Sequence, residues 1–165
     1  MANNEKKQYI RILFVCMGNI CRSPAAEGVC RHMVNQELIE KIDIESCGIG
    51  DWHIGQTPDR RMQEAAKARG IALNSRAQQF KMAFYDEYDY ILASDQEVLK
   101  HLFHYAATPE HKAKLSLMTA FSGPYNGQEV PDPYYEPTAA FDLVLDMLED
   151  SCSGLLKHIS KEVLE

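Results

Sequence analysis

Short apolar runs alternate with longer amphipathic stretches along the chain. A nearly continuous apolar run covers residues 9–15, and further β-rich runs occupy residues 42–46, 88–93 and 114–118. A short apolar run bounded by turn residues is typical of a strand that is buried on both faces of a parallel sheet. These four runs therefore predict the strands of a parallel sheet.

The amphipathic stretches predict helices. In residues 23–38 an apolar stripe follows Ser23, the expected N-cap, and Pro24, which suits the first helical position. Further helices are expected at residues 58–69, 95–105 and 137–162. Because strands and helices alternate, we expect residues 1–165 to form a single doubly wound α/β domain.

Two loops with reactive side chains follow predicted strands. The stretch CMGNICRSP (residues 16–24) comes directly after the first strand, and the loop that contains Asp132 follows the fourth. In a doubly wound sheet, ligands bind beyond the C-terminal ends of the strands. We therefore expect one functional site at this edge, built from both loops.

Composition and charge narrow the class of protein. With 45% hydrophobic and 25% charged residues, the chain has an ordinary globular composition, and its net charge of -7 argues against a nucleic-acid partner. The apolar runs are too short to span a membrane, and residues 1–8 do not lead into a signal peptide. The five cysteines form neither a disulfide framework nor a zinc motif, so we expect a cytoplasmic protein without a metal or other cofactor.

The residue types in CMGNICRSP suit a phosphate-binding loop around a nucleophilic thiol. Gly18 allows a sharp turn and Asn19 tolerates positive φ, so that consecutive N–H groups can form an anion-binding nest. The helix that begins near Ser23 directs its N-terminal dipole to the same place, and Arg22 can bind two phosphate oxygens. Such surroundings favour the thiolate of Cys16, although an isolated cysteine at a strand end is usually a small buried residue.

CMGNICRSPAAEG, together with VPDPYY before the last predicted helix, resembles the low-molecular-weight protein tyrosine phosphatases. The likeness extends over nearly the whole chain, including the Gly-rich loop around Trp52 and the stretch YDYILASD. It implies a four-stranded parallel sheet and metal-free hydrolysis of phosphotyrosine, in a protein or peptide, through a phosphocysteine intermediate. By position, it implies that Cys16 is the nucleophile, Arg22 the transition-state clamp and Asp132 the general acid. The oligomeric state is not fixed by the sequence, and a monomer is expected.

The resemblance also implies roles for residues around these three. The phosphate-binding group is expected to comprise Met17, Gly18, Asn19, Ile20, Cys21 and Ser23. The walls of a slot for the aromatic ring are expected to be Trp52, His53, Tyr134 and Tyr135. Ser46 is expected to brace the loop with Asn19, but it could instead be a solvent-facing hydroxyl at a strand end, and His53 a solvated loop residue.

Two positions depart from the family's pattern. Ser75 stands where many members have a histidine that holds the phosphate-binding loop, and Gln78 stands where many have an arginine. A serine side chain is too short to replace an imidazole. The sequence therefore leaves open how the loop is braced in this chain.

Other functions are compatible with such a loop. Arsenate reduction needs two further cysteines in a mobile segment, and residues 80–118 contain none. In arginine phosphatases of the family a threonine tends to replace Ile20 and an apolar aromatic residue Tyr134, so these two residues favour phosphotyrosine. A non-catalytic binding module would need neither the thiol of Cys16 nor the carboxylate of Asp132. Cys21 could trap an oxidised Cys16 as a disulfide, or it could be a small buried residue lining the loop.

Overall fold

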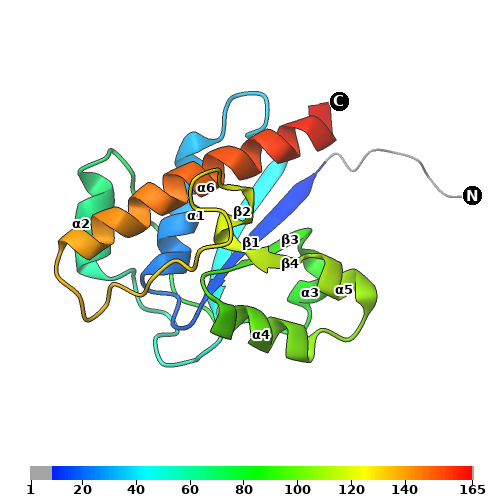
Figure 1. Ribbon diagram of the computed structural model, residues 1–165, viewed down its shortest axis with the longest axis horizontal. Coiled ribbons are helices and arrows are strands. Elements are labelled where there is room, and N and C mark those ends of the chain that lie inside the picture. The colour runs from blue at the N-terminus through cyan, green and yellow to red at the C-terminus, as the bar shows by residue number, and fades with distance from the viewer. Residues whose placement is uncertain (1–8, 165) are drawn as a thin grey trace, which may run out of the picture.

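The sheet at the centre of the fold has the strand order β2-β1-β3-β4, and every neighbouring pair is parallel. Figure 1 presents the computed structural model, which describes residues 9–164. Residues 1–8, in which no signal peptide is predicted, lie outside the described residues. The predicted α/β fold with a four-stranded parallel sheet is confirmed.

The four strands lie within two residues of the predicted runs at each end. They are β1 (Ile10–Cys16), β2 (Ile42–Gly48), β3 (Tyr90–Ala93) and β4 (Leu115–Leu117). Side chains of β1 alternate between two apolar cores, with Ile12 and Phe14 in one and Leu13 and Val15 in the other. Because β1 is central in the sheet, the loop that follows it starts in the middle of the C-terminal edge.

The helices cover both faces of the sheet (Figure 1). On one side lie α1 (Arg22–Met33), α2 (Arg60–Lys67) and the long α6 (Ala139–Leu164). On the other side lie α3 (Phe84–Glu87), α4 (Gln96–Tyr105) and α5 (Pro109–Ala113). A 3-10 helix, η1 (Met118–Phe121), follows β4. In the described part of the chain, no helix is long and apolar enough to cross a membrane.

The predicted start and end of the first helix are wrong. α1 begins at Arg22 with Cys21 as its N-cap, so Ser23 and Pro24 are its second and third residues. The hydroxyl of Ser23 contacts the site described below and therefore does not cap the helix. α1 ends at Met33 rather than at residue 38, because residues 36–41 form a turn. The short elements α3, α5 and η1 were not predicted, since four or five residues carry no readable periodicity.

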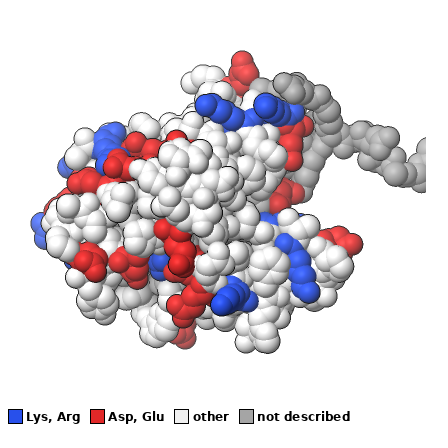
Figure 2. Space-filling model, in the orientation of Figure 1, with Lys and Arg blue, Asp and Glu red and all other residues white. Residues whose placement is uncertain are grey.

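Charges of both signs are interspersed over the face of the molecule seen in Figure 2. Acidic residues lie between the lysines and arginines on this face, in keeping with the net charge of -7. Recognition of a nucleic-acid backbone requires a contiguous basic surface, which this face does not offer.

Candidate active site

The phosphate-binding loop, residues 16–23, lies at the C-terminal end of β1. Asn19 has a φ of 56° and is the one non-glycine residue with positive φ within the described residues, in agreement with its predicted tolerance of this conformation. The start of the loop is held from the side of β2, because Ile49 N–H donates to Cys16 O at 3.0 Å and Gly50 N–H to Met17 O at 2.9 Å.

Gly48, the last residue of β2, lets the loop lie directly on the neighbouring strand. A Cβ atom at this position would stand 2.9 Å from Asn19 N, from Gly18 C and from Met17 O. Any side chain would therefore displace the backbone of the phosphate-binding loop. This close approach at Gly48 was not predicted from the sequence, although glycine in a strand often marks a close approach of another backbone.

Several N–H groups of the loop remain available for a ligand. Within residues 9–164, no hydrogen bond is donated by the backbone N–H groups of Gly18, Ile20, Cys21, Arg22 and Ser23. The last two belong to the first turn of α1, where the helix dipole adds partial positive charge. This arrangement suits an anion with several oxygen atoms.

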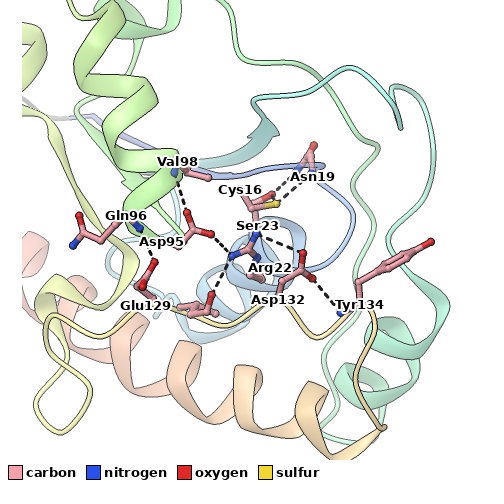
Figure 3. A network of polar contacts seen from close by, with 11 residues as sticks. Cys16, Asn19, Arg22, Ser23, Asp95, Gln96, Val98, Glu129, Asp132 and Tyr134 are labelled. Atoms are coloured by element: carbon pink, nitrogen blue, oxygen red, sulfur yellow. Dashed lines mark hydrogen bonds and ion pairs between the residues drawn. The ribbon is translucent and has the colours of Figure 1, made fainter.

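The thiol of Cys16 lies at the base of the loop with two possible donors beside it. Its Sγ accepts from Asn19 N–H at 3.2 Å and lies 2.9 Å from Ser23 Oγ. Asn19 Nδ2 donates one hydrogen to Ser23 Oγ at 2.7 Å and the other to Ser46 Oγ at 2.9 Å. Since Ser23 Oγ accepts from Asn19, its own hydrogen has two acceptors within reach, Cys16 Sγ at 2.9 Å and Cys47 O at 3.3 Å, and the sulfur is the nearer of the two. Figure 3 shows Asn19 and Ser23 directed at Cys16.

Gln78 and Glu27 brace the loop from behind. Gln78 N–H donates to Asn19 Oδ1 at 2.9 Å, which fixes the orientation of the Asn19 amide, and Gln78 Nε2 donates to Ser46 O at 3.0 Å. Ser46 is buried and donates to Glu27 Oε1 at 2.8 Å, so the alternative of a solvent-facing hydroxyl is wrong. Burial raises the pKa of Glu27. The loop is thus braced in a chain that has Ser75 in place of a histidine.

The guanidinium of Arg22 is buried and held on one side. Its Nη1 donates to Asp95 Oδ2 at 2.6 Å and to Val130 O at 3.1 Å, while its Nη2 lies 3.8 Å from Asp132 Oδ2 (Figure 3). Burial alone would lower the pKa of Arg22, but Cys16 and Asp95 outweigh burial and raise it, so the side chain stays charged. Asp95 is also the N-cap of α4, since its Oδ1 accepts from Val98 N–H at 2.9 Å; its contact with Arg22 was not predicted from the sequence.

Asp132 lies on a loop, residues 131–136, that we call the Asp132 loop. Its side chain is 54% exposed. Asp132 Oδ1 accepts from Tyr134 N–H at 3.1 Å, whereas Oδ2 faces Arg22 (Figure 3). Val130, just before the loop, donates through its N–H to Ser94 O at 2.8 Å at the end of β3. This bond brings the loop to the edge of the sheet where Cys16 lies.

A cavity of about 310 Å³ joins the three predicted catalytic residues. It is lined by Cys16, Arg22 and Asp132 with Met17, Gly18, Ile20, Cys21, Trp52, His53, Tyr134 and Tyr135. The other three predicted site residues are buried, Asn19 and Ser23 within the loop and Ser46 behind it. A larger hollow of about 550 Å³ lies beside α2, but it is lined by no cysteine and adjoins none of the three catalytic candidates.

The rim of the cavity is aromatic. Trp52 is 65% exposed and lies against Gly50, where a Cβ atom would stand 1.8 Å from Trp52 Cζ3. The His53 ring lies against Gly18, and its Nδ1 pairs with Gln56 Oε1 at 3.0 Å. The rings of Tyr134 and Tyr135 meet edge to face with centroids 4.8 Å apart. These side chains stand where an aryl group bound at the mouth would contact them.

Among the described residues, Cys21 is the one further cysteine that lines the cavity. All five cysteines are free and buried. Burial, together with Asp59 and Asp132, raises the pKa of Cys21, which therefore carries its proton; both readings of Cys21 stay predictions. Within the part of the chain that the structure describes, no three His, Cys, Asp or Glu side chains are grouped so that they could hold a metal ion.

Comparison with known proteins agrees with this geometry. Residues 11–165 match the family described as low molecular weight phosphotyrosine protein phosphatase. A putative low molecular weight protein-tyrosine-phosphatase of Synechocystis is 39% identical, with coverage of 94% of this chain and 99% of the relative. These two matches extend over nearly the whole chain.

Solved structures extend the comparison to the fold. A protein tyrosine phosphatase from Entamoeba histolytica superposes with a TM-score of 0.88 at 37% identity, covering 92% of this chain and 97% of that chain. A Drosophila arginine phosphatase superposes with a TM-score of 0.83 at 29% identity, covering 91% and 98%. With a family match over all but the first ten residues and a relative 39% identical along its whole length, the chain belongs to the low molecular weight protein tyrosine phosphatases.

Proposed function

We propose that this phosphatase hydrolyses phosphotyrosine in proteins or peptides with Cys16 as nucleophile, Arg22 as clamp and Asp132 as general acid. One observation carries the assignment. A thiol, a guanidinium and a carboxylate from distant segments line the same cavity of about 310 Å³, with free N–H groups around the thiol. A phosphoryl group can bind there between the nucleophile and the acid.

The first step transfers the phosphoryl group to the enzyme. The Cys16 thiolate, stabilised by hydrogen bonds from Asn19 N–H and the Ser23 hydroxyl, attacks phosphorus, and the bond to the tyrosine oxygen breaks. Charge on the equatorial phosphate oxygens is stabilised by the loop N–H groups and by the free edge of Arg22. Asp95 holds the other edge of the guanidinium, so little reorganisation is needed during reaction.

The leaving tyrosine oxygen takes its proton from Asp132. Oδ1 accepts from Tyr134 N–H, so Oδ2, which faces Arg22 and the cavity, is the oxygen placed to deliver the proton. In the second step the same carboxylate, now ionised, takes a proton from water as the water attacks the phosphocysteine. The sulfur then leaves as a thiolate, again with the Ser23 hydroxyl as its donor.

The aromatic rim supports an aryl phosphate as substrate. Trp52 and Tyr134 stand at the mouth, where they can pack on the faces of a tyrosine ring whose phosphate reaches Cys16. A phosphoserine side chain is shorter and would leave these contacts unmade. Similarity to an arginine phosphatase makes phosphoarginine the second candidate substrate.

We also propose that the enzyme works as a monomer in the cytoplasm. The chain supplies the proposed nucleophile, clamp and acid of the cavity by itself, which is compatible with a monomer that is active. Five free thiols are typical of proteins that function in a reducing compartment.

Turnover of matched phosphopeptides tests the proposed function. Peptides with phosphotyrosine, phosphoserine or phosphoarginine in one sequence context should be compared by kcat/KM, with Cys16→Ser as the blank. The proposal predicts that phosphotyrosine is preferred over both. Preference for phosphoarginine, or activity that persists in Cys16→Ser, would contradict it.

A further inference from the structure

Arg61, the second residue of α2, lies between the phosphate-binding loop and the Asp132 loop, which form opposite sides of the cavity. Its Nε and Nη2 donate to the carboxylate of Asp59 at 3.2 and 3.1 Å, and Nη2 also donates to Tyr134 O at 2.8 Å. The guanidinium lies 5.4 Å from the centroid of the Tyr134 ring and 4.7 Å from that of Phe141. Arg61 thus joins the start of α2 to the Asp132 loop.

Each end of this bridge reaches the reaction centre. On one side, Asp59 N–H donates to Ile20 O in the phosphate-binding loop at 2.7 Å. On the other side, Tyr134, whose carbonyl accepts from Arg61, donates its N–H to Asp132 Oδ1 (Figure 3). A continuous chain of hydrogen bonds therefore runs from the phosphate-binding loop to the carboxylate of Asp132.

Few other contacts hold the Asp132 loop. Within the described residues, the bond from Arg61 is the one hydrogen bond that ties residues 131–136 to another segment of the chain. The ion pair between Arg22 and Asp132 is long, at 3.8 Å, and the Asp132 side chain is half exposed. Without Arg61, the position of the loop would rest on its anchored start at Val130.

We propose that Arg61 is a positioning residue that holds the Asp132 loop against the phosphate-binding loop, so that Asp132 Oδ2 reaches the leaving oxygen; this rests on the proposed role of Asp132. The planar guanidinium suits the task because it binds the Asp59 carboxylate along one edge, donates to a carbonyl and stacks on two rings. An ammonium group on a lysine cannot do all three.

The test compares Arg61→Gln with Arg60→Gln. Arg60 is the adjacent residue of α2, its side chain is 90% exposed, and it pairs with Glu64 on the same helix. The readout is kcat/KM for phenyl phosphate, a poor leaving group that needs the acid, and for 2,4-dinitrophenyl phosphate, which does not. Because kcat/KM extends only to the first irreversible step, it reports phosphoryl transfer to Cys16.

Arg61→Gln is expected to lower kcat/KM for phenyl phosphate by about tenfold or more, a part of the 10²–10⁴ that a positioned acid contributes. The value for 2,4-dinitrophenyl phosphate should change by less than about threefold on the same reasoning. Arg60→Gln should leave both unchanged. Arg61→Lys should resemble Arg61→Gln, and it serves as the test variant if Arg61→Gln does not fold.

Equal losses with both substrates, or no difference from Arg60→Gln, would overturn the inference. Asp132→Asn, measured in parallel, separates this failure from failure of the proposed function. If Asp132→Asn discriminates between the two leaving groups and Arg61→Gln does not, only the role of Arg61 is lost. If neither discriminates, Asp132 is not the acid, and the inference about Arg61 falls with it.

Discussion

The phosphate-binding loop and the Asp132 loop face each other across one cavity, but they are built differently. Cys16 in the phosphate-binding loop is 3% exposed, and its neighbours are bonded to β2, to residues 48–50 and to Gln78. In the Asp132 loop, Tyr135 is 92% exposed, and within residues 9–164 the loop is tied to other segments by one hydrogen bond from Arg61 and a long ion pair with Arg22. The phosphate-binding loop is therefore packed into the edge of the hydrophobic core, whereas the Asp132 loop is a surface segment.

The difference follows the chemistry of the substrate. The phosphoryl group is the same in every phosphotyrosine substrate, so its donors can be fixed in place before binding, which gives the strongest electrostatic stabilisation. Under the proposed function, the leaving side carries the peptide around the tyrosine, whose residues differ from one substrate to another. An exposed loop with few contacts opens at low cost in free energy and can adapt to them.

The largest effect is expected from replacing Cys16, the proposed nucleophile. Cys16→Ser should abolish turnover, because a serine hydroxyl is not ionised near neutral pH and transfers a phosphoryl group poorly. The fold and the binding of inorganic phosphate should be retained, because the loop N–H groups and Arg22 are unchanged. Thermal unfolding with and without phosphate, next to a turnover assay, checks both; activity within a few-fold of the wild type would rule out covalent catalysis.

The next largest effect is expected from replacing Arg22, the proposed clamp beside the phosphate-binding loop. Arg22→Lys should lower kcat by about 10²–10³, since a single ammonium cannot bind Asp95, Val130 O and two phosphate oxygens together. The loss should be the same for phenyl phosphate and for 2,4-dinitrophenyl phosphate. Retention of most of the activity would mean that the loop N–H groups alone stabilise the transition state.

A substitution in the exposed Asp132 loop should have an effect that depends on the leaving group of the substrate. Asp132→Asn is expected to lower kcat/KM for phenyl phosphate by about 10² or more, and to have much less effect on 2,4-dinitrophenyl phosphate. An equal loss for both substrates would give Asp132 a structural role only.

The same variant should change the pH profile. The proposed mechanism uses the carboxylic acid of Asp132 as proton donor and the thiolate of Cys16 as nucleophile, so the wild-type profile should be bell-shaped. Asp132→Asn carries no such proton, so the basic limb should disappear. A basic limb that persists in the variant belongs to another group.

The smallest effect is expected behind the phosphate-binding loop. Gln78→Leu removes the side-chain bond to Ser46 O but keeps the backbone N–H that orients Asn19. One hydrogen bond contributes about 1 kcal/mol, which corresponds to about fivefold in rate, so kcat/KM should fall by at most about fivefold, and equally for both aryl phosphates. A loss that depends on the leaving group would contradict the separate roles of the phosphate-binding loop and the Asp132 loop.

The sequence predicted the local parts of this architecture and missed the long-range parts. β1 was readable because its apolar run is continuous, and the phosphate-binding loop because its residues are contiguous with distinctive spacing. Ser23 was misread as an N-cap, since its preference for that position is real but the hydroxyl is used at Cys16.

The supporting residues lacked a readable signal. Asp95 fits the general pattern of a helix cap, Arg61 that of a surface arginine and Gly48 that of a strand end, and each acts on a segment far away in the sequence. Gln78 was identified only as a departure from the family pattern. Its backbone N–H and side-chain amide both brace the loop, which residue type alone does not reveal.

Covalent catalysis by Cys16 is tested most directly by identifying the group that carries the phosphoryl during turnover. Asp132→Asn, in which the attack of water is slowed, should be mixed with 2,4-dinitrophenyl phosphate, denatured rapidly at neutral pH and examined by intact-mass and peptide mass spectrometry. With Cys16 as the nucleophile, one phosphoryl group should be added, on the peptide that contains Cys16 and on its sulfur. Phosphorylation of any other residue, or continued turnover with no phosphorylated enzyme, would contradict it.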